Sequence, residues 1–99
     1  MMTTPNGTPI AIPTIEARRA LYGAAAFLRD EGLIGVPVDI LYEALQLTGA
    51  GAAVRGRALA ALRLLLLGSS EPGALGEAIR ELSNEGIAEA CERAAKLVG

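Results

Sequence analysis

The chain has 99 residues and a net charge of −2, and it contains no histidine. A chain of this length forms a single domain with a modest core. The lack of histidine removes the most common general base and metal ligand, and a single cysteine cannot form an intrachain disulfide. Because the remaining residues form no catalytic motif, we expect a protein that is not an enzyme and that binds no metal or cofactor.

Alanine and leucine supply most of the apolar residues, and only three residues are aromatic. Alanine is the strongest helix former, so this composition favours helices throughout the chain. The arginine, alanine and glycine content is typical of a GC-rich coding sequence, which indicates a bacterial or phage source. The longest apolar stretch, residues 58–67, is too short to span a membrane. We therefore expect a cytoplasmic protein without a membrane partner.

Residues 1–13 contain Pro5, Gly7, Pro9 and Pro13. Proline lacks a backbone donor and clashes with the preceding turn of a helix. This spacing therefore predicts an extended N-terminal arm over residues 1–13, and residues 14–99 form the folded domain.

Three helices are predicted where apolar residues recur at helical spacing between good start and stop residues. They cover residues 14–31, 37–48 and 52–67. Thr14 is a good N-cap, and Pro37 suits the first position of a helix. A glycine follows the first and the third of these helices, where it favours termination.

Two more helices are predicted from apolar stripes in the C-terminal third of the chain. Residues 75–82 carry one stripe and residues 87–98 another, and on one continuous helix the two would be offset by roughly 100°. The offset predicts a break near residues 84–86. All connections are short, so we expect an all-α fold, a compact bundle of four to five short helices with an extended N-terminal arm.

The third predicted helix is apolar on every side. Its core-facing stripe comprises Val54, Ala58, Ala61, Leu62 and Leu65. Leu64 and Leu67 point in other directions, because successive helical residues are about 100° apart. A helix that is apolar all round is buried, either in its own domain or between subunits. The leucine run therefore predicts that Leu64 and Leu67 belong to an interface.

The first predicted helix offers a second candidate surface. Its outer face, away from the core stripe, carries Ile15, Arg18, Tyr22 and Arg29. Tyrosine and arginine are enriched at binding hot spots, and arginine binds carboxylate and phosphate in a forked geometry. We expect this face to bind a partner protein or a small anion such as a nucleotide. Phe27, on another flank, predicts that the helix is buried on more than one side, and it joins Leu64 and Leu67 in the predicted interface.

Residues 37–67 also allow a helix-turn-helix interpretation. Ala44 and Val54 match the spacing of small and apolar positions in that motif, and Gly49 lies near its turn. The second helix would then read DNA through Arg55, Arg57 and Arg63. These arginines point in different directions, and the negative net charge does not favour a nucleic-acid partner.

The last helices carry a run of acidic residues at three- and four-residue steps. They are Glu77, Glu81, Glu85, Glu89 and Glu92. This pattern is typical of a solvated helix face. Cys91, among alanines, is expected in the core.

These features predict a small, non-enzymatic helical protein that acts by protein–protein interaction, as a homo-oligomer or with a further protein partner. An adaptor, an inhibitor and an assembly component all fit this description. Two alternatives stay open, namely a helix-turn-helix DNA-binding regulator and an oligomeric binder of a small anionic ligand.

Overall fold

Short connections join five helices in the computed structural model, which describes residues 8–68 and 74–98. The helices are α1 (Thr8–Asp30), α2 (Pro37–Leu47), α3 (Ala52–Leu67), α4 (Leu75–Ile79) and α5 (Asn84–Leu97). No strand occurs within these residues. The prediction of an all-α fold is confirmed.

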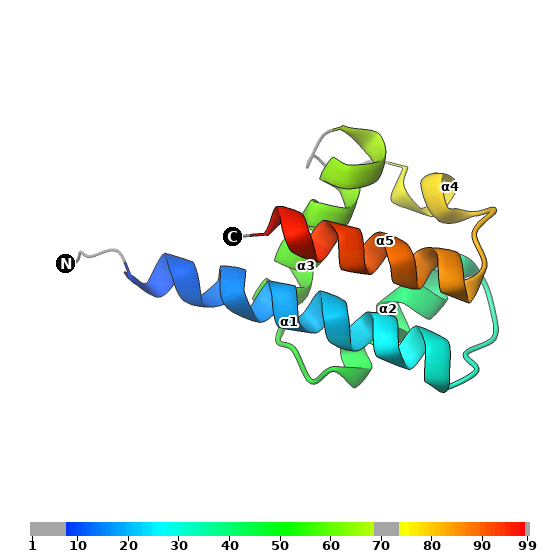
Figure 1. Cartoon of the computed structure of the whole chain (residues 1–99), viewed down its shortest axis with the longest axis horizontal. Helices are drawn as coiled ribbons and strands as arrows, with labels where there is room; N and C mark the ends of the chain where they lie inside the picture. The colour runs from blue at the N-terminus through cyan, green and yellow to red at the C-terminus, as the bar shows by residue number, and fades with distance from the viewer. Residues whose placement is uncertain (1–7, 69–73, 99) are drawn as a thin grey trace.

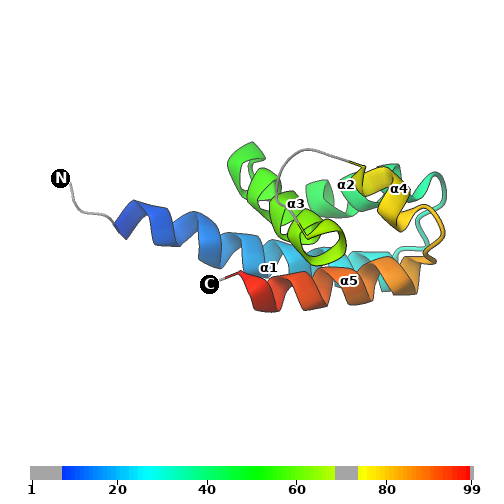
Figure 2. The same ribbon diagram turned by 90° about the horizontal axis from the view of Figure 1, so that it is seen from above.

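The helices form two layers. α1 and α5 lie side by side and run in opposite directions (Figure 1). A view turned by 90° shows α2, α3 and α4 together on one side of this pair (Figure 2). α3 crosses the pair and contacts both of its helices, while α2 packs on α1. α1 is therefore the central element of the fold.

The core lies between the two layers and consists of leucine, isoleucine and alanine side chains. Its largest fully buried residues are Leu21, Leu28, Leu41, Leu45, Leu62, Ile79, Ile87 and Cys91. Alanines at positions 17 and 24 of α1 and 88 and 95 of α5 are also buried. Small side chains let helices approach closely, which fits the pairing of α1 with α5.

The ends of α2 and α3 lie within one residue of their predicted positions. Pro37 occupies the first position of α2. α3 ends at Leu67, and the next residue, Gly68, has a left-handed backbone with φ of 75° and donates its N–H to the Leu64 carbonyl at 3.1 Å. Glycine adopts this conformation without a steric penalty, so it is a good residue to end a helix.

The predicted N-terminal arm is wrong over residues 8–13, because α1 already begins at Thr8. Residues 1–7 lie outside the described residues. Pro9 lies in the first turn of α1, where backbone N–H groups have no acceptor inside the helix, so a proline removes nothing there. Pro13 leaves the Pro9 carbonyl without its helical donor, and the helix continues despite this missing bond.

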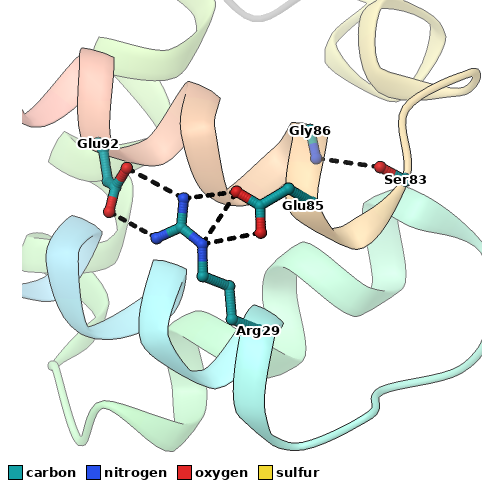
Figure 3. A network of polar contacts seen from close by, with 5 residues as sticks. All are labelled: Arg29, Ser83, Glu85, Gly86 and Glu92. Carbon is teal, nitrogen blue, oxygen red and sulfur yellow. Dashed lines mark hydrogen bonds and ion pairs between the residues drawn. The ribbon is translucent and has the colours of Figure 1, made fainter.

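The predicted break between the last two helices is present but lies earlier than residues 84–86. α4 ends at Ile79 and α5 begins at Asn84. Ser83 caps α5, since its side chain accepts a hydrogen bond from the Gly86 N–H at 3.1 Å (Figure 3). Residues 84–86 therefore form the first turn of α5, and a serine cap marks the start of that helix.

Candidate protein interface

The C-terminal end of α3 leaves two leucines exposed. Leu62 is fully buried, whereas Leu65 and Leu66 are partly buried against the core. The side chains of Leu64 and Leu67 are 47 % and 41 % exposed. Residues three apart are neighbours on a helix, so these two form one patch. Within residues 8–68 and 74–98, the other helices therefore do not fully cover the end of α3.

Phe27 lies elsewhere, in a cleft of about 440 Å³ between α1 and the α2–α3 connection. It is half-buried there, and Leu47 and Val54 line the same cleft. Its burial is thus explained by its own chain and requires no second subunit. Val54 and Leu64 are about 15 Å apart along α3. The structure therefore does not bring Phe27 to the patch of Leu64 and Leu67.

A close approach of α1 to the α2–α3 connection shapes this cleft. A side chain added at Gly23 would place its Cβ 3.2 Å from Cγ2 of Thr48. The Thr48 hydroxyl in turn accepts the N–H of Ala50 at 3.2 Å, which fixes the connection. Gly23 is therefore the residue that lets this connection contact α1.

The predicted surface on α1 is the edge at which α1 meets α5. Arg29 Nε donates to both carboxylate oxygens of Glu85, at 2.9 and 3.0 Å, and Nη2 donates to Oε2 of the same residue at 2.8 Å. Its Nη1 and Nη2 donate to Glu92 at 2.6 and 3.1 Å (Figure 3). One guanidinium thus binds two carboxylates of α5, the forked geometry that arginine favours.

Arg18 makes the corresponding contact at the other end of the helix pair. Its Nε donates to the Val98 carbonyl at 3.0 Å, and its Nη2 donates to the same oxygen. Ile15 and Tyr22 are 49 % and 43 % exposed. Of the four residues predicted to bind a ligand, the two arginines therefore bind α5, and the two apolar residues stay at the surface.

The charges in this network stabilise one another. Hydrogen bonds from Arg29 lower the pKa of Glu85 and of Glu92 below their ordinary value, and the two glutamates raise the pKa of Arg29. All three groups are therefore charged at neutral pH. The sequence predicts the acidic run as a solvated face and does not reveal that Glu85 and Glu92 bind Arg29. Their seven-residue spacing on one helix face was the available signal.

The three arginines of α3 do not converge. Arg55 donates to the Ala50 carbonyl at the start of the helix, Arg57 is exposed and Arg63 is half-buried. α2 and α3 each pack on α1 and make few direct contacts with one another. The two helices of a helix-turn-helix pack together, so this arrangement gives the DNA-binding alternative little support.

An exposed apolar turn joins α1 to α2, and sequence reasoning did not single it out. Ile34 is 93 % exposed and Val36 is 59 % exposed. The turn is held in place, because the Asn84 amide donates to the Leu33 carbonyl at 2.9 Å. Gly35 between the two apolar residues has φ of 145°, a conformation that favours glycine.

Two kinds of reactive group can be looked for in the described residues, a metal site and the cysteine thiol. These residues contain no group of three side chains that could hold a metal ion. Burial raises the pKa of the Cys91 thiol to about 12, so it is not a thiolate at neutral pH. Among these residues, no helix has the length and hydropathy needed to cross a membrane. No protein-family model, curated protein or solved structure matches the chain. Function is therefore inferred from the described surface.

Proposed function

We propose that this protein is a non-enzymatic interaction module that associates with further copies of itself through the end of α3. The observation that supports the proposal is the exposed pair Leu64 and Leu67, beside the partly buried Leu65 and Leu66. Single exposed apolar residues are ordinary on soluble proteins, whereas a contiguous apolar patch marks an interaction site. Covering such a patch contributes roughly 25 cal/mol for each Å² removed from water.

Two leucines are too small an area for a stable interface on their own. Stable interfaces bury about 1,200–2,000 Å² in total. The partner surface must therefore contribute apolar area of its own. Most of the binding energy of an interface comes from a few residues at its fully covered centre. We assign Leu64 and Leu67 to this centre.

Light scattering coupled to gel filtration tests this function. The double substitution Leu64→Ser with Leu67→Ser removes the apolar patch and is expected to shift the wild-type mass toward that of one chain. Leu97→Ser is the matched control, because Leu97 is 51 % exposed on α5. It is expected to leave the mass unchanged. Equal masses for the wild type and the double variant would contradict the proposal.

A further inference from the structure

The two exposed leucines belong to a longer strip along the outer face of α3. We define the α3 strip as Ala53, Gly56, Ala60, Leu64 and Leu67. These residues lie within about 40° of one direction, because successive helical residues are about 100° apart. Ala60 is half-buried and the other four are exposed. The strip therefore runs along almost the whole helix, over about 21 Å at about 1.5 Å per residue.

The size of the side chains changes along the α3 strip. Its first half contains Ala53 and Gly56, and its second half contains Leu64 and Leu67. A Cβ added at Gly56 would have no atom of the described residues within 4 Å. The backbone of α3 is therefore uncovered at Gly56 within residues 8–68 and 74–98. Small residues let a neighbouring helix approach closely, so a large side chain of that helix can pack there.

A second copy of α3 offers leucines at the spacing that this surface requires. If two α3 helices lie antiparallel with their Ala60 residues level, Leu64 of one copy is level with Gly56 of the other. Leu67 is then level with Ala53, because both lie seven residues from Ala60. A parallel pair would instead place leucine against leucine and leave the small residues uncovered. The order of large and small residues therefore makes the strip complementary to itself in the antiparallel direction.

Two-fold symmetry also enlarges the area that the contact covers. An antiparallel pair uses every contact twice, and two-fold dimers are the most common oligomers. Four leucines are then covered, two from each copy, so the partner surface supplies the apolar area that the leucines of one chain lack. Arg57 and Arg63 lie about 60° to either side of Ala60, where long side chains can keep their charged ends at the rim of the contact.

We propose that two copies of this chain pair through their α3 strips, antiparallel about a two-fold axis at Ala60. This inference rests on the self-association proposed above and names the partner surface and its direction. Leu64 and Leu67 of each copy pack over Gly56 and Ala53 of the other. A closed pair leaves neither strip free, so assembly stops at the dimer.

Gly56→Leu distinguishes this pairing from a general association of apolar surfaces. The added side chain meets open space, and leucine is a better helix former than glycine, so urea unfolding of dilute protein should show no loss of stability. The same side chain occupies the place of Leu64 from the second copy. We therefore expect sedimentation equilibrium to show a dissociation constant at least about tenfold higher than that of the wild type.

Ala26→Leu is the matched control for this variant. Ala26 is exposed on α1, outside the α3 strip, and its substitution adds a leucine to another part of the surface. The dissociation constant should stay unchanged. If Gly56→Leu instead associates as tightly as the wild type, or more tightly, the antiparallel pairing is wrong.

Disulfide cross-linking tests the position of the two-fold axis independently. Ala60→Cys places the introduced thiols of two copies beside each other, within the short Cβ–Cβ distance that a disulfide needs. The native Cys91 is buried and does not compete. Mild oxidation should convert this variant into a covalent dimer. Leu97→Cys, at an exposed position on α5, should remain a single chain.

The outcomes separate the two levels of the proposal. If the wild type is monomeric at about 1 mM, both self-association and the antiparallel pairing are wrong. If the wild type assembles but Ala60→Cys cross-links no better than Leu97→Cys, the antiparallel pairing is wrong and self-association stands.

Discussion

Arg29 at the end of α1 binds Glu85 and Glu92 of α5 simultaneously, although the glutamates lie 56 and 63 residues away in the chain. The contact joins the last turn of α1 to α5, and Arg18 joins the other end through the Val98 carbonyl. Together these polar contacts fix how the two antiparallel helices are aligned. These polar contacts lie beside the buried alanines at positions 17, 24, 88 and 95. The small side chains let α1 and α5 approach closely.

Arg29→Met should lower the melting temperature by a few degrees at pH 7. The pKa values of Glu85 and Glu92 are lowered in the folded state, so their contribution is complete above the unfolded-state pKa of about 4.3. It is lost as the pH falls and the carboxylates bind protons. Thermal unfolding should therefore show a lower melting temperature for Arg29→Met than for the wild type at pH 7. At about pH 2 the two melting temperatures should be nearly equal.

Arg80→Met serves as the control for this measurement. Arg80 is 64 % exposed and pairs with Glu77 and Glu81 near its own position in the chain. Exposed local pairs contribute little, so this variant should melt like the wild type at both pH values. If Arg29→Met lowers the melting temperature equally at neutral and acid pH, the contacts with Glu85 and Glu92 are not the cause of the decrease.

Cys91 should react with a thiol reagent only when the chain unfolds. It is fully buried, and its pKa of about 12 leaves almost no thiolate at pH 8. Labelling with Ellman's reagent in increasing urea should therefore follow the unfolding transition measured by circular dichroism. Rapid labelling in the absence of urea would show that the packing around α5 is wrong.

Gly23 and Gly56 should respond differently to substitution by alanine. Both lie inside helices, where alanine is more favourable than glycine by about 1 kcal/mol. A Cβ at position 56 meets open space, whereas at position 23 it would press on Thr48 at 3.2 Å. Urea unfolding should show Gly56→Ala to be stabilising by about 1 kcal/mol. Gly23→Ala should increase the free energy of unfolding by less than Gly56→Ala, or decrease it. Equal increases for the two variants would contradict the close contact between position 23 and Thr48.

Leu62 and Leu64 provide a matched pair on one helix. Leu62 is fully buried, so Leu62→Ala should lower the free energy of unfolding by about 2–5 kcal/mol. Leu64 is half exposed, and Leu64→Ala should cost well under half of that in dilute protein, where assembly contributes nothing. Urea denaturation of both variants measures the difference. A comparable loss at the two positions would place Leu64 in the core instead of on the surface.

Local signals predicted most helix positions correctly. Pro37 and Gly68 mark helix ends by backbone geometry, which operates whatever the rest of the chain does. The prolines give a wrong prediction for residues 8–13, because α1 contains both Pro9 and Pro13. A proline in the first turn removes no hydrogen bond, so the position of Pro9 within the helix mattered more than the number of prolines.

Long-range contacts were beyond such reasoning. The apolar pattern placed Arg29 away from the core stripe, but it did not reveal that α5 lies along that edge. The same limit applies to Phe27, whose partial burial comes from the α2–α3 connection. The direction of Leu64 followed from helical periodicity alone, but whether another helix covers it depends on how the helices pack.

The most direct test of self-association is sedimentation equilibrium of the wild type from about 1 µM to about 1 mM, which covers moderate and weak affinities. We predict that the average mass rises with concentration. The Leu64→Ser, Leu67→Ser variant should stay at the mass of one chain throughout. A wild type that remains at that mass at the highest concentration would contradict the account.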